Sequence, residues 1–98
     1  MEHSATIVAQ THQTKPEALA IIAAALELPV TGAATPHTYI ALGRGCRLEV
    51  DIPKFGESLP LTIDIYSRRS AAAARLSAQN VLDVLTTATG WQIEHLDG

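Results

Sequence analysis

Three arginines and two serines gather in the segment 67–70 and shortly after it, at Arg75. The segment stands between a run that predicts a strand and a run that predicts a helix. The first turn of a helix presents unpaired backbone N–H groups and the positive end of the helix dipole, which together bind anions. We therefore expect Arg68, Arg69, Ser70 and Arg75 to form the anion site if the chain binds a small anion. The alternative, which we favour, is an ordinary N-cap at Ser70 beside solvated arginines.

A second group of side chains with chemical potential is acidic. Alternation predicts that one face of a sheet carries four carboxylates, Glu49, Asp51, Asp64 and Glu94. Carboxylates on adjacent strands supply the oxygen ligands that Mg²⁺ and Ca²⁺ prefer, or an acidic surface for a basic protein partner. The competing interpretation is a solvated sheet face on which Arg47 and Tyr66 are interleaved with the acids. We favour the solvated face and predict neither a bound metal nor a cofactor.

The other reactive side chains are scattered. Cys46 is the only cysteine, which excludes an internal disulfide and a cysteine-based zinc site. Its place in an alternating run predicts that it points inward, where cysteine behaves as a small apolar residue. The four histidines lie in four different segments without a metal-site spacing. No glycine-rich phosphate loop is present either, so we predict no catalytic residue and rank an enzyme third among the functional hypotheses.

Composition sets the class of protein that must position these residues. The chain has 98 residues, of which 47% are apolar and 17% charged, so we expect residues 1–98 to form one folded domain. Seven basic against ten acidic residues give a net charge of -3, which provides no general attraction for nucleic acid. The longest apolar run, residues 18–26, is shorter than the roughly 20 residues of a membrane span. Without a basic leader at the N-terminus, we expect a cytoplasmic protein with no membrane segment.

The first half of the chain predicts a strand followed by a helix. Residues 5–10 are short and apolar, as in a buried strand. Thr14 and Glu17 have the spacing of a capping box, and Pro16 fits the first turn of a helix. We therefore predict a helix over residues 15–28 that ends at Pro29. Residues 29–38 then predict a connection.

The middle of the chain predicts a hairpin. Residues 39–52 are extended, and Gly43 and Gly45 within them allow either a bulge in one long strand or a tight turn between two short strands. We favour the bulge. After a loop at residues 53–59, residues 61–66 alternate as a second strand. We expect Arg47 to lie opposite Asp64, because the neighbouring register would place Glu49 opposite Asp64 and bring like charges together.

The last third of the chain predicts the longest helix, over residues 71–89, and a final strand over residues 91–96. Gly90 fits the left-handed position that ends many helices. Three more apolar residues of the helix, Leu76, Leu82 and Val84, are expected to widen its buried surface. The residues predicted to share the buried stripe of this helix are Ala71, Ala74, Ala78, Val81, Leu85 and Ala88.

The element order predicts an α+β fold: a ferredoxin-like βαββαβ sandwich with a four-stranded antiparallel sheet and two helices on one face. Right-handed connections would place the first and last strands side by side. The fold class hosts many activities and decides none of them.

Our leading functional hypothesis is a small intracellular, non-enzymatic protein-interaction or dimerisation domain. It would form a homodimer through an edge strand or sheet face, or act as an acidic, immunity-type inhibitor of a protein partner. The alternative is a regulatory domain that senses a small anion or metabolite at the helix start formed by residues 67–70.

Overall fold

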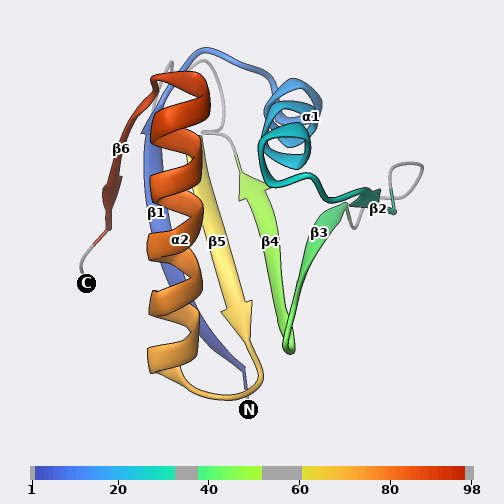
Figure 1. Cartoon of the computed structure of the whole chain (residues 1–98), viewed down its shortest axis with the longest axis vertical. Coiled ribbons are helices and arrows are strands. Elements are labelled where there is room, and N and C mark those ends of the chain that lie inside the picture. The colour runs from blue at the N-terminus through green and yellow to red at the C-terminus, as the bar shows by residue number, and fades with distance from the viewer. Residues whose placement is uncertain (1, 33–37, 52–60, 97–98) are drawn as a thin grey trace.

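The computed structural model describes residues 2–32, 38–51 and 61–96. They form an α+β fold in which six antiparallel strands make one sheet in the order β2-β3-β4-β5-β1-β6. Both helices lie against the same face of this sheet (Figure 1). The prediction of a four-stranded, ferredoxin-like sheet is therefore wrong. The first and last strands do lie side by side, because β1 (His3–Gln10) pairs with both β5 (Leu61–Ser67) and β6 (Gln92–His95).

One of the two additional strands comes from the segment for which we favour one bulged strand. It is a hairpin of β3 (Tyr39–Gly43) and β4 (Cys46–Asp51), with a register irregularity near Gly43. The connecting residues Arg44 and Gly45 have φ angles of 54° and 76°. Two consecutive positive φ angles match the twist of a two-residue hairpin turn. The glycines thus serve a turn, and the prediction of a bulged single strand is wrong.

The sixth strand lies within the predicted connection at residues 29–38. Val30 and Thr31 form the two-residue strand β2 (Val30–Thr31), which pairs with Ile40 and Tyr39 of β3. So short a strand has no periodicity that a sequence can reveal. The rest of that connection from residue 33 to 37, which includes His37, and the predicted loop at residues 53–59 lie outside the described residues.

The first helix, α1 (Lys15–Leu26), begins as its sequence predicts and ends two residues earlier than residue 28. The Glu17 backbone N–H donates to the Thr14 hydroxyl over 3.3 Å, and the Thr14 backbone N–H donates to the Glu17 carboxylate over 3.0 Å. This is the capping box. At the other end, Glu27 takes a left-handed conformation that stops the helix before Pro29.

The second helix, α2 (Ala71–Thr89), has the predicted bounds. Its first turn is capped by Ser70, and Gly90 at its end has a φ of 75°. The helix buries Ala74, Ala78, Val81 and Leu85 against β1 and β5, whereas Ala71 and Ala88 are exposed. Small side chains at the first of these contacts let the helix axis approach the sheet closely.

The core lies between the sheet and the two helices. It is built mainly from aliphatic residues at alternate strand positions. The fully buried ones with the largest side chains are Ile7, Ile22, Ile40, Leu48, Leu61, Ile63, Ile65, Leu85, Val50 and Val81. Neither helix of the described chain is long and apolar enough to cross a membrane. We call the opposite face of the sheet, which neither helix covers, the open face. It carries most of the charged strand residues.

Candidate functional site

The open face is organised around Arg47 on β4. Its guanidinium group forms an ion pair with Glu49 over 2.8 Å and a second ion pair with Glu2. It also lies over the ring of Tyr66, with its central carbon 4.4 Å from the ring centre. The hydrogen bonds to Glu2 and Glu49 raise the pKa of Arg47, and the bond to Arg47 lowers the pKa of Glu2. Arg47 is thus a fixed cation at the centre of the predicted acidic surface.

The register of β4 and β5 places Glu49 directly opposite Asp64, and Arg47 opposite Tyr66. Our prediction that Arg47 would face Asp64 is therefore wrong. The like charges are tolerated because each carboxylate has its own partner. Glu49 is bound by Arg47, and Asp64 accepts a hydrogen bond of 2.6 Å from the hydroxyl of Thr6 on β1.

Tyr66 shares this environment. Its partial burial raises the pKa of the Tyr66 phenol, and the carboxylates of Asp64 and Glu49 raise that pKa further. The phenol therefore stays protonated at neutral pH, as an uncharged hydroxyl beneath the Arg47 guanidinium. A protonated phenol and a guanidinium that is already bound by two carboxylates offer no general base at neutral pH.

The four predicted acids do not converge. Glu49, Asp64 and Asp51 lie on the adjacent strands β4 and β5, whereas Glu94 on β6 is separated from them by the whole width of β1. Among residues 2–32, 38–51 and 61–96, no group of three or more acidic, histidine or cysteine side chains is arranged to hold a metal ion. On the open face of the described chain, the ion pairs join Arg47 to Glu2 and Glu49, and Asp64 is bound by a neutral hydroxyl.

The predicted anion-binding residues lie at the start of α2. The hydroxyl of Ser70 accepts from the backbone N–H of Ala73 over 3.0 Å, and that of buried Ser67 accepts from the N–H of Arg69 over 3.1 Å. The N–H of Arg68 donates to the carbonyl of Gly45 over 3.3 Å. The arginine side chains, including that of Arg75, are exposed. The two serines therefore bind the backbone of the turn and of the first helical turn.

Cys46 points inward, as predicted, and is a buried free thiol. Its sulfur lies 3.5 Å from the hydroxyl of Ser77 on α2. His3, His12 and His95 come from separate elements, and none of them approaches Cys46 within hydrogen-bond distance. This thiol has no neighbouring base within the described chain.

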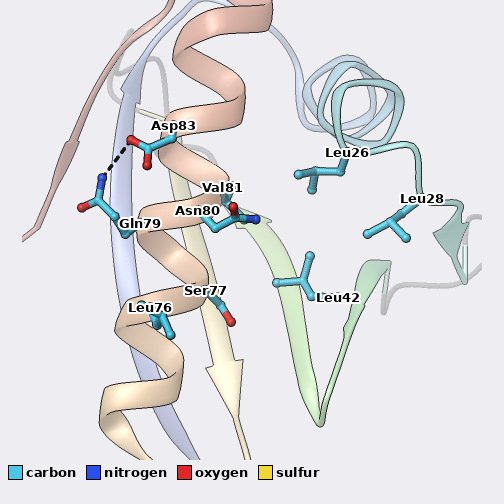
Figure 2. Close-up of a pocket in the computed structure, with 9 residues that line it drawn as sticks. All are labelled: Leu26, Leu28, Leu42, Leu76, Ser77, Gln79, Asn80, Val81 and Asp83. Carbon is cyan, nitrogen blue, oxygen red and sulfur yellow. Dashed lines mark hydrogen bonds between the residues drawn. The ribbon is translucent and has the colours of Figure 1, made fainter.

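A partly apolar groove with a volume of about 540 Å³ lies beside α2. Leu26 and Leu28, at the end of α1, and Leu42 on β3 point across it toward Ser77, Asn80 and Val81 of α2 (Figure 2). The opening continues over the outer surface of α2, where its remaining lining residues are Leu76, Gln79 and Asp83. We call this opening the leucine groove.

Leu76 is the most notable lining residue. It is 74% exposed, although a leucine at this helical position was predicted to widen the buried surface. The Gln79 amide donates to the Asp83 carboxylate over 2.9 Å on the flank of α2 that faces away from α1. Leu26, Leu28 and Leu42 at the same opening are half-buried. Apolar surface that is accessible at an opening marks binding sites in soluble proteins. Sequence periodicity did not reveal this groove, because its leucines come from three elements that meet only in the fold.

The free edge of β6 is a second surface that could bind a partner. The Leu96 N–H donates to the Thr6 carbonyl of β1 over 2.9 Å. In antiparallel strands the residues that bond to one neighbour alternate with those that point the other way. The N–H and C=O groups of Ile93 and His95 therefore point away from β1, toward the side where no strand of the described chain pairs.

No protein-family model matches the chain, and no curated protein matches it significantly.

Proposed function

We propose that this chain is a protein-interaction domain and that the leucine groove receives an amphipathic, basic segment of a partner protein. The observation that carries the proposal is Leu76, a leucine with 74% of its surface exposed at an opening that four further aliphatic side chains line. Leaving such a surface in water costs free energy that a partner's apolar side chains recover.

The charges around the groove favour a basic partner. Asp83 is a lining residue, and the described lining includes no cation. The groove also borders the C-terminal end of α1, where the helix dipole is negative and no basic residue lies in the last turn. Lysine or arginine on a bound segment would interact favourably with both features, while its leucines would fill the apolar floor.

The net charge of -3 agrees with an acidic binder of a basic protein.

The side chains that line the leucine groove argue against a chemical reaction there. The polar lining side chains are a serine, two amides and one carboxylate, and that carboxylate is already hydrogen-bonded to Gln79. Such a set positions a ligand but offers no activated nucleophile.

A designed helical peptide of leucine and lysine tests the proposal, with a leucine and glutamate peptide of identical spacing as its control. Calorimetric titration should give a Kd for the lysine peptide at least about tenfold below that of the control. The substitution Leu76→Gln should weaken binding about tenfold or more, the effect of losing one buried leucine side chain. Leu96→Gln is the matched control, because Leu96 is 58% exposed and does not line the groove.

Two results would contradict the proposal. One is equal binding of the two peptides, which would show that the charges near the groove do not select the partner. The other is an equal loss of affinity in the Leu76→Gln and Leu96→Gln variants, which would show that the peptide binds exposed leucines without regard to the groove.

A further inference from the structure

A second interaction surface lies at the β6 edge of the sheet, where a ring nitrogen of His95 forms a 2.7 Å hydrogen bond with Gln79 of α2. We propose that β6 pairs with β6 of a second copy of this chain, in the antiparallel register centred on Ile93. The starting observation is the edge itself. β6 is the last strand of the sheet, and the backbone groups of Ile93 and His95 have no partner among the described residues.

Symmetry restricts how two such edges meet. Two copies that pair side by side in antiparallel fashion are related by a twofold axis perpendicular to the sheet. One residue of β6 must then lie opposite itself, and its neighbours must pair symmetrically about it. The backbone groups of Ile93 point to the free edge, so a register centred on Ile93 gives a closely bonded pair at the axis.

The side chains of the open face select between the central registers. With Ile93 at the axis, Gln92 lies opposite Glu94 of the second copy, and the two side chains can form a hydrogen bond. With Glu94 at the axis, its carboxylate would lie opposite the same carboxylate of the second copy. Both residues are exposed on β6, and directly opposed like charges destabilise a sheet. The register centred on Ile93 avoids that repulsion.

This register also uses the available backbone groups of the strand. The Ile93 residues of the two copies exchange two N–H···O bonds. The His95 N–H of each copy reaches the Trp91 carbonyl of the other. Trp91 contributes its carbonyl alone, because its own N–H already donates to the hydroxyl of Thr89 over 3.0 Å. The pairing between the two copies therefore stops at Trp91, the residue that connects the end of α2 to β6.

Sedimentation over a concentration series tests the proposal with three substitutions at exposed positions. Gln92→Lys places a lysine opposite Glu94 of the second copy at two symmetric sites, and should lower the dimer Kd about two- to thirtyfold. Gln92→Glu places like charges at the same two sites and should raise Kd by a similar factor. Glu94→Gln, which leaves two amides facing each other, should change Kd less than either. The thermal unfolding of each variant serves as the control for folding.

A monomer at every concentration, with all variants folded, overturns the proposal. So does a dimer that Glu94→Gln strengthens more than Gln92→Lys, because that order identifies the register centred on Glu94. Equal effects of Gln92→Lys and Gln92→Glu would place the interface away from β6 and overturn it as well. Gln92 and Glu94 do not line the leucine groove, so none of these results decides whether the groove binds peptides.

Discussion

Glu49 lies directly opposite Asp64 in the antiparallel pair of β4 and β5. Two carboxylates in this position repel each other, and the neighbours of the pair compensate for the repulsion. Arg47 binds Glu49 over 2.8 Å, and the hydroxyl of Thr6 donates to Asp64 over 2.6 Å. The cation that makes the register acceptable therefore lies on the same strand as one of the acids, two residues before it.

Removing that cation should destabilise the protein through the acids. We expect Arg47→Gln to lower the free energy of unfolding by about 1 kcal/mol, the upper range for a partly exposed ion pair. In an Asp64→Asn background the same substitution should cost less, because an amide at residue 64 still accepts from Thr6 but no longer repels Glu49. Urea unfolding of the four proteins in this cycle measures the coupling. Equal costs in both backgrounds would show that Asp64 and Arg47 act independently.

The capping box of α1 should make stability depend on pH. The backbone N–H of Thr14 and then its hydroxyl lower the pKa of Glu17 from its ordinary value of 4.5. The unfolded chain therefore binds a proton at Glu17 before the folded chain does as the pH falls. The stability that this carboxylate contributes is complete above about pH 4.5 and is lost as the pH falls through the folded pKa.

Thermal unfolding of the parent and of Glu17→Gln across this range tests that expectation. The difference between their melting temperatures should shrink as the pH falls below 4.5, because only the parent loses a charged cap. A difference that stays constant down to about pH 3 would show that the charge of Glu17 contributes nothing.

The hairpin turn between β3 and β4 carries a local conformational cost. Arg44 has a φ of 54°, a left-handed conformation that is unfavourable for most residues by about 1 kcal/mol. Asparagine tolerates it better and is preferred at this position of two-residue hairpin turns. We expect Arg44→Asn to raise the free energy of unfolding by about 0.5 kcal/mol and Arg44→Val to lower it. Chemical denaturation distinguishes the two, and a loss of stability in both variants would point to a contact of the arginine side chain.

Ser70 should contribute to stability as a helix cap. Its hydroxyl binds the N–H of Ala73 over 3.0 Å, so Ser70→Ala should lower the free energy of unfolding by about 1 kcal/mol. Ser70→Asp should retain most of it, because aspartate accepts the same bond and favours the positive end of the helix dipole. If Ser70→Ala is neutral in urea unfolding, another group must satisfy that N–H.

The arginines beside this cap provide a separate test for anion binding. Both side chains are exposed, and the serines on either side already bind the backbone. We expect phosphate to shift the melting temperature of the parent and of the double variant Arg68→Gln, Arg69→Gln by the same amount. A shift that disappears in the double variant would instead support an anion site, since a ligand stabilises only the protein that binds it.

The features predicted correctly from the sequence are local ones. The Thr14 and Glu17 capping box and both bounds of α2 depend on residues a few positions apart. The errors concern contacts between distant segments. Pairing of Val30 with Ile40 adds a strand that has no periodicity of its own. The turn has arginine at residue 44, whereas asparagine or aspartate at this position is the usual sequence signal for such a hairpin.

The candidate sites show the same division. We predicted Arg47 opposite Asp64 by avoiding like charges between β4 and β5 alone. The hydroxyl that binds Asp64 belongs to Thr6 on a third strand, β1. Leu76 sits in a helix whose buried residues were largely identified, yet no element of the described chain covers it. Which apolar residues of a helix stay exposed depends on where its neighbours end, and α1 ends at Leu26.

The pairing of β1 with β6 has a consequence for how the chain reaches its fold. Ile7 and His95 lie opposite each other, although they are close to the two ends of the sequence. Residues are synthesised in chain order, so β1 can pair only with β5 until β6 has been made. Contacts between such distant residues slow folding, because a long loop must close before they form. The other edge of β1 therefore stays uncovered until β6, a strand of four residues, has formed beside it.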